Sequence, residues 1–165
     1  MAKVYEFLAN GFEEVEAMAP VDILRRGGVD IKTVSVTGSE WATSSHGVTM
    51  KADLVFTRPE DYADADMILL PGGLPGATNL NEHEGVRATL LAQAKAGRRI
   101  GAICAAPMVL GSLGLLDGKK ATCSPGFERY MTGADYTAEL FQEDGMILTG
   151  SHAALCLPHP RLLRT

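Results

Sequence analysis

Short, continuously apolar runs alternate with longer amphipathic stretches along this chain. Uninterrupted apolar runs of this length are typical of strands buried on both faces, and the longer stretches are typical of helices. The alternation predicts an α/β fold in which helices cover both faces of a doubly wound parallel sheet. We expect strands at residues 4–9, 31–36, 66–70, 99–103, 120–123 and 146–149, with a small β excursion over 48–52 and 54–57. We expect helices at residues 13–26, 82–96 and 105–113, and a helical turn at 127–131.

Three of the predicted strands are followed at once by turn-forming residues or by a cysteine. The first strand runs into Asn10-Gly11, the third into Pro71-Gly72-Gly73, and the fourth ends at Ile103-Cys104. Ligands of doubly wound sheets bind at the carboxyl ends of the strands. If these three strands are neighbours, their loops converge on one crevice.

The strongest candidate for chemistry is Cys104. It ends the apolar run 99–103, and the small residues Ala105 and Ala106 open the next predicted helix. This strand–turn–helix pattern resembles the nucleophile elbow of α/β-hydrolases, with sulfur in place of a serine oxygen. A helix N-terminus beneath the turn would lower the thiol pKa, and the Ala105 N–H would form half of an oxyanion hole. The alternative is a cysteine buried for packing.

Acidic residues open the predicted helix 13–26. We interpret Glu13 and Glu14 as acids at the helix N-terminus that interact favourably with the helix dipole. Glu16 differs because it lies in phase with the apolar positions Met18 and Ile23. Beside a thiolate its carboxyl would be held protonated and would donate a hydrogen bond to the sulfur.

The glycine-rich loop 72–76 has three interpretations. It is a plain connection, a loose phosphate loop, or a source of oxyanion donors. No lysine follows it and its spacing fits neither nucleotide-binding motif, which weakens the phosphate interpretation. The N–H of Gly73 is the preferred second oxyanion donor, because a residue without Cβ allows a substrate oxygen to approach closely.

Taken together, these segments resemble the ThiJ/PfpI superfamily, and most closely its ThiJ-type branch that includes the human parkinsonism-linked chaperone/deglycase. The matching motifs lie at residues 9–16, 70–73, 102–107 and 121–126, and the resemblance covers about residues 2–150. It implies a flavodoxin-like sandwich, a homodimer and a site without cofactor or metal. It also implies roles for four residues: Cys104 as nucleophile, Glu16 as its protonated partner, and Gly73 and Ala105 as oxyanion donors.

The resemblance implies a cofactor-independent thiol enzyme that acts on small reactive 2-oxoaldehydes or glycated adducts, as a glyoxalase or deglycase. The alternative is a redox sensor or chaperone that works through oxidation of Cys104. A weaker alternative is an intracellular cysteine peptidase or glutaminase-like amidotransferase, although Ala105 stands where the protease-like branch has a histidine. Further candidates for the substrate pocket are Gly72, Asn10, His46 and Ser124. His46 stands where the human branch member has an arginine, with plain surface as its alternative, and Ser124 where that member has a histidine.

Composition and charge narrow the partners and the compartment that we expect for this chain. The formal net charge is −5 and there is no basic run, so nothing points to a nucleic acid or an anionic membrane as partner. The first apolar run is too short for a signal peptide or a membrane span. The three cysteines form no zinc-binding pattern, and a reducing cytoplasm is the expected compartment. Glu6 is unusual, because a charge inside a central strand needs a buried partner, a bend or an edge position.

The end of the chain departs from the family pattern. We expect a single domain over residues 1–150 and an atypical tail over 151–165, in which Pro158 and Pro160 prevent the family's long C-terminal core helix. A sheet face without that helix would favour association with a partner. His152 and Cys156 lie four residues apart, but two ligands without a third do not make a metal site.

Overall fold

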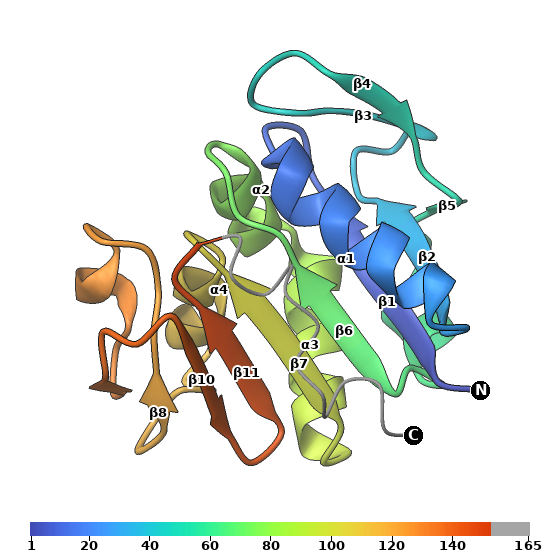
Figure 1. Ribbon diagram of the computed structural model, residues 1–165. Coiled ribbons are helices and arrows are strands. Elements are labelled where there is room, and N and C mark those ends of the chain that lie inside the picture. The colour runs from blue at the N-terminus through green and yellow to red at the C-terminus, as the bar shows by residue number, and fades with distance from the viewer. Residues whose placement is uncertain (153–165) are drawn as a thin grey trace.

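A seven-stranded sheet forms the centre of the protein, as the computed structural model shows for residues 1–152, the part of the chain that it describes (Figure 1). The strand order is β10-β11-β7-β6-β1-β2-β5. Every neighbouring pair is parallel except β10 and β11. The strands are β1 (Lys3–Leu8), β2 (Asp30–Ser35), β5 (Leu54–Val55), β6 (Met67–Leu70), β7 (Arg99–Ile103), β10 (Phe141–Asp144) and β11 (Ile147–Gly150). This confirms the predicted α/β fold with flavodoxin-like strand order.

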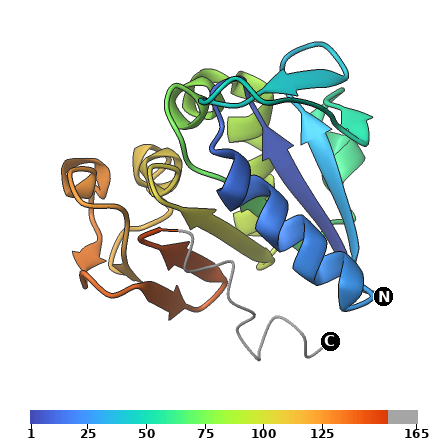
Figure 2. The same cartoon turned by 45° about the horizontal axis from the view of Figure 1, so that its top comes forward.

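Helices lie on both sides of the sheet. Figures 1 and 2 show α1 (Glu14–Arg26) on one side and α3 (Glu84–Lys95) on the other. On the side of α3, α2 (Gly76–Glu82) packs against both α3 and α4 (Pro107–Ser112). Successive side chains of β1 explain the two layers, since they point to opposite faces of the sheet. Val4 packs in the cluster that contains Leu24 of α1, whereas Phe7 belongs to the core cluster that contains Leu90 of α3.

The smaller elements depart most from the prediction. The expected excursion at 48–52 is β4 (Thr49–Lys51), and its hairpin partner β3 (Trp41–Thr43) lies in a segment expected as a polar loop. The predicted helix 82–96 is α3, whose first turn is capped by His83, which accepts a hydrogen bond of 3.1 Å from the Val86 N–H. The helix α2 before it was not expected. The remaining elements are η1 (Pro59–Tyr62), β8 (Lys120–Ala121), η2 (Glu128–Tyr130) and β9 (Asp135–Tyr136).

Glu6 lies in the middle of the central strand β1, directly between β2 and β6. Its side chain is 1% exposed, and its Oε2 has no hydrogen-bond partner among the described residues. Burial raises the pKa of this carboxyl well above its ordinary value, and the more distant charge of Arg25 opposes that only in part. Glu6 has neither the edge position nor the close partner that its charge would need. It is therefore a neutral acid in the folded protein.

Two predictions concern the end of the chain. Residues 153–165 lie outside the described part, and so do the predicted effects of Pro158 and Pro160 and the dismissed pairing of His152 with Cys156. Among the helices that are described, none has the length and apolar character needed to cross a membrane.

Candidate active site

The loops after these three predicted strands meet at one edge of the sheet, as the sequence suggested. They follow β1, β6 and β7, which are adjacent in the sheet (Figure 1). Backbone hydrogen bonds join two of the loops: the Gly76 N–H donates to the Gly11 carbonyl at 3.1 Å, and the Glu13 N–H donates to the Gly72 carbonyl at 3.0 Å. The site is therefore built on backbone contacts between loops that are far apart in the sequence.

Cys104 occupies the sharp turn that the sequence predicted. Its φ is +58°, a left-handed conformation that is uncommon for a residue with a side chain and is concentrated at functional sites. Two hydrogen bonds of 2.9 Å hold the turn: the Cys104 N–H donates to the Gly150 carbonyl, and the Ser124 N–H donates to the Cys104 carbonyl. The helix after the turn begins at Pro107 rather than at residue 105 and has six residues. It offers less of a dipole to the sulfur than we expected.

Glu16 contacts the Cys104 thiol from α1. Its side chain is 6% exposed, and its Oε2 accepts a hydrogen bond of 2.9 Å from the Gly72 N–H. Burial raises the pKa of the Glu16 carboxyl, although its hydrogen bonds with Cys104 and Gly72 oppose the shift. In this arrangement the Cys104 thiol donates to the carboxyl, since their hydrogen bond lowers the pKa of Glu16 and raises that of Cys104.

Burial also raises the pKa of the Cys104 thiol, and the negative charge of Glu16 raises it further. The Ser124 hydroxyl and the Gly73 N–H stabilise the thiolate but do not outweigh these effects. The expectation of a lowered thiol pKa is therefore wrong, because the turn buries the sulfur beside a carboxyl group. The two acids are coupled, because the negative charge of Glu16 disfavours ionisation of the thiol.

Both glycines of the loop after β6 are required by close contacts. A Cβ on Gly72 would lie 2.5 Å from the Cβ of Cys104 and 2.6 Å from Oε2 of Glu16. Gly73 has a φ of +87°, and its N–H points at the sulfur of Cys104. Within residues 1–152, the Ala105 N–H has no hydrogen-bond acceptor. The Gly73 N–H therefore lies at the sulfur, and the Ala105 N–H is not taken up by another described residue.

The other pocket candidates have different surroundings. Ser124 is buried, and its hydroxyl contacts the thiol. Asn10 uses its side chain to accept a hydrogen bond of 2.9 Å from the Thr43 N–H, which holds β3 in place. His46 is exposed and lies 3.0 Å from Oε1 of Glu14, above the start of α1. Ser124 is thus in the centre of the site, whereas Asn10 and His46 lie around it.

His152 is a neighbour of the site that we did not predict. Its Nδ1 lies 3.2 Å from Oγ of Ser124, and its charge lowers the pKa of Glu16. The sequence carried one signal for this position, since His152 comes two residues after a strand whose carboxyl end lies on the same edge of the sheet as Cys104.

A cation-binding geometry occurs once among the described residues. One ligand atom each of Glu13, Glu14 and His46 lies within 4.8 Å of the others. These atoms already have partners, because Glu13 caps α1 by accepting from the Glu16 N–H and Glu14 pairs with His46. These contacts account for the positions of the three side chains without a metal ion.

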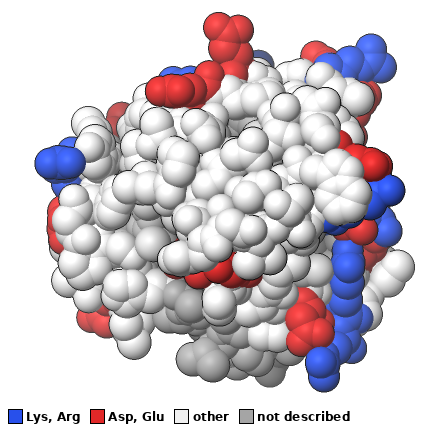
Figure 3. All heavy atoms as spheres, turned by 90° about the horizontal axis from the view of Figure 1, so that it is seen from above, with Lys and Arg blue, Asp and Glu red and all other residues white. Residues whose placement is uncertain are grey.

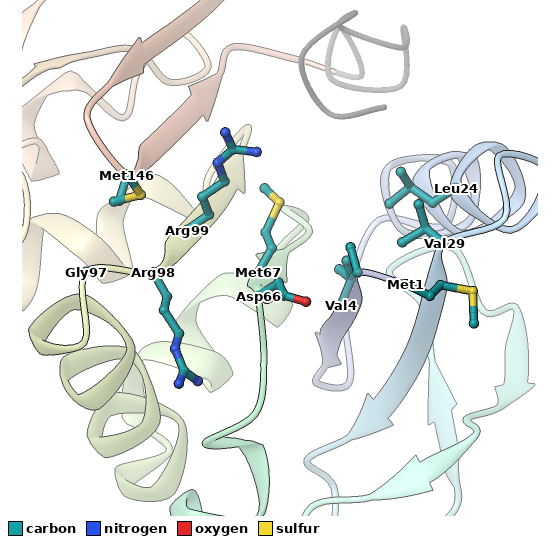
Figure 4. Close-up of a pocket in the computed structure, with 11 residues that line it drawn as sticks. Met1, Val4, Leu24, Val29, Asp66, Met67, Gly97, Arg98, Arg99 and Met146 are labelled. Carbon is teal, nitrogen blue, oxygen red and sulfur yellow. The ribbon is translucent and has the colours of Figure 1, made fainter. Parts of the chain in front are cut away.

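A separate cavity of about 490 Å3 lies at the opposite end of the sheet, near the start of β1 and β6 (Figure 4). Val4 and Met67 line it, and the side chains of Arg98 and Arg99 point away from each other there. No group of reactive side chains converges on this cavity. The visible surface over the carboxyl ends of the strands is mostly uncharged, with most charged side chains toward its margin (Figure 3).

Comparisons with known proteins agree with this geometry. Residues 2–157 match the DJ-1/PfpI family. Protein DJ-1 homolog B of Arabidopsis thaliana is 39% identical over 151 residues, which are 89% of this chain and 34% of that protein, so the chain spans about a third of that relative. Deglycase PH1704 of Pyrococcus horikoshii is 34% identical over 137 residues, which are 80% of this chain and 78% of that protein. The structure of oxidized Toxoplasma gondii DJ-1 superposes with a TM-score of 0.87 at 31% identity, over 95% of this chain and 85% of that one. The chain belongs to the DJ-1/PfpI family.

Proposed function

We propose that this protein is a cofactor-independent thiol enzyme that converts small 2-oxoaldehydes, or their adducts, by adding them to Cys104. The observation that supports this best is the contact between the Cys104 sulfur and the Glu16 carboxyl, a proton donor held at the sulfur by burial. The mostly uncharged face around the strand ends suits a small neutral aldehyde. A relative named as a deglycase supports the same reaction class.

The reaction begins with addition of the Cys104 thiolate to the aldehyde carbon. The carbonyl electrons move to oxygen, where the N–H groups of Gly73 and Ala105 stabilise the charge, and Glu16 gives its proton to form a hemithioacetal. The Glu16 carboxylate then removes the proton from the former aldehyde carbon, which gives an enediol, and returns it to the neighbouring carbon, while the hydroxyl proton moves from the first oxygen to the second. This produces a thioester, and water hydrolyses it to a 2-hydroxy acid and the free thiol.

The test is lactate formation from methylglyoxal without glutathione. We expect turnover by the wild-type chain, none by Cys104→Ser, and a loss of at least about a hundredfold in Glu16→Gln, because an amide donates a hydrogen bond but cannot transfer a proton. Glu60→Gln, an exposed glutamate on η1, is the matched control and should keep full activity. Turnover that survives in Glu16→Gln would remove Glu16 from the mechanism.

The second candidate is redox sensing or chaperone action through Cys104. It is favoured by the likeness to an oxidized DJ-1 structure and by the partial exposure of the thiol. Two equivalents of a peroxide would oxidise the thiolate, first to the sulfenic and then to the sulfinic acid. The two oxygens of the sulfinic acid could accept hydrogen bonds from Glu16 and Gly73. A gain of two oxygens at Cys104, together with aggregation-suppressing activity only after oxidation and no lactate formation, would favour this candidate over the enzyme.

A further inference from the structure

A buried hydroxyl connects the reactive thiol with an exposed imidazole. Ser124 is 6% exposed, and its hydroxyl contacts the Cys104 thiol. The same hydroxyl contacts the Ser151 carbonyl and lies 3.2 Å from Nδ1 of His152. A hydroxyl has one proton and can accept two more hydrogen bonds, so Ser124 can accept from the thiol while it donates to one of the other two groups.

The position of His152 follows from the sheet. Strand β11 pairs with β7 so that Gly150 lies opposite Ile103, and the Cys104 N–H donates to the Gly150 carbonyl at 2.9 Å. His152 comes two residues after Gly150, at the same edge as the thiol. Its side chain is exposed, so a proton received at Nδ1 can be exchanged with water through the other ring nitrogen.

The charged groups around the thiol explain why it needs a base. Glu16 faces it from α1, with Glu13 one turn earlier, and Cys123 lies beside Ser124. Burial raises the pKa of Cys123 to about 11, so this second thiol is neutral. Glu16 disfavours the thiolate when it is ionised, and His152 is the positively charged group within range when it is protonated.

We propose that His152 is a positioning residue that takes up the Cys104 proton through the Ser124 hydroxyl. The thiol proton moves to Oγ of Ser124 while the Ser124 hydroxyl proton moves to Nδ1 of His152. Ser124 is unchanged by the exchange, and the products are a thiolate and an imidazolium. The hydroxyl reaches Nδ1 by rotating away from the Ser151 carbonyl. The inference rests on the proposed function, since it supplies the thiolate that attacks the aldehyde.

The test is the rate at which iodoacetamide alkylates Cys104, measured by peptide mass from about pH 5 to about pH 9. We expect His152→Gln to react about tenfold more slowly than the wild type at neutral pH, because it lacks the base that takes up the thiol proton. Ser124→Ala should slow the reaction to the same extent, whereas Ser124→Thr, which keeps the hydroxyl, should react at the wild-type rate.

His83→Asn is the matched control. The Asn side chain can replace the cap that His83 gives α3, and its profile should superimpose on that of the wild type. The inference is overturned if His152→Gln or Ser124→Ala reacts at the wild-type rate at neutral pH. Alkylation needs no aldehyde. A chain that forms no lactate but shows the His152-dependent profile would contradict the proposed function and support this inference.

Discussion

Replacing Glu6 with glutamine should change how the stability of the protein depends on pH. Glu6 is buried in the central strand, its Oε2 has no partner among the described residues, and burial raises its pKa well above 4.5. Glutamine has the same shape and does not titrate. Any energy lost by leaving its amide unpaired is independent of pH, so the informative quantity is the slope and not the absolute stability.

The sign and the size follow from proton binding. Above the ordinary carboxyl pKa, Glu6 of the unfolded chain has lost its proton, whereas Glu6 of the folded protein keeps it. Raising the pH therefore favours the unfolded state, by about 1.4 kcal/mol for each pH unit until the folded pKa is reached. The loss accumulates with every pH unit above the ordinary carboxyl range for as long as the folded protein keeps this proton.

Urea unfolding at several pH values measures this directly. The difference in unfolding free energy between Glu6→Gln and the wild type should grow in favour of the variant as the pH rises, and then level off. The matched control is Glu60→Gln, whose exposed side chain should leave a constant difference. Parallel curves for Glu6→Gln and the wild type would show that Glu6 is ionised in the folded state, and the argument from burial would be refuted.

Three further predictions concern the site and the assembly. Gly72→Ala should lower the rate of lactate formation at least about tenfold, because the new Cβ would lie 2.5 Å from the Cβ of Cys104. Its circular dichroism spectrum should keep the wild-type shape, and a normal rate would contradict the close packing. Limiting iodoacetamide at neutral pH should label Cys104 before Cys123, which is fully buried and has a pKa of about 11; the opposite order would disprove the assignment of the nucleophile. We expect a homodimer with about twice the chain mass of 17.5 kDa, since Trp41 and Leu54 are exposed along one edge of the fold; a monomer in light scattering would refute this.

The central sheet was predictable because its strands are buried on both faces. The four strands β1, β2, β6 and β7 are rich in apolar or β-branched residues, and each lies within one residue of its predicted bounds. The hairpin strand β3 was not predictable, because Trp41–Thr43 lies at the periphery and carries no buried run. The short helix α2 was not predicted, because its residues Gly76–Glu82 follow a glycine- and proline-rich loop and carry no apolar periodicity.

In the site, too, the sequence revealed what adjacent residues encode and missed what depends on contacts between distant segments. The turn at Cys104 is encoded by adjacent residues, so the sequence revealed it. The burial of Glu16 against the thiol arises from contacts between α1 and two loops, and it reversed the expected direction of the thiol pKa. The approach of His152 to Ser124 depends on how β11 pairs with β7, and no local pattern encodes that pairing.

The distance along the chain between these contacts has a kinetic consequence. The surroundings of the Cys104 sulfur are complete only when Glu16, Gly72 and Gly150 have reached it from distant parts of the chain, the last through a strand at the end of the described residues. Pairings between distant segments form slowly, because the connecting chain must first be ordered. In refolding from urea, the return of the native alkylation rate at this one sulfur should therefore follow the return of helical signal. The delay would time the docking of β11 on β7.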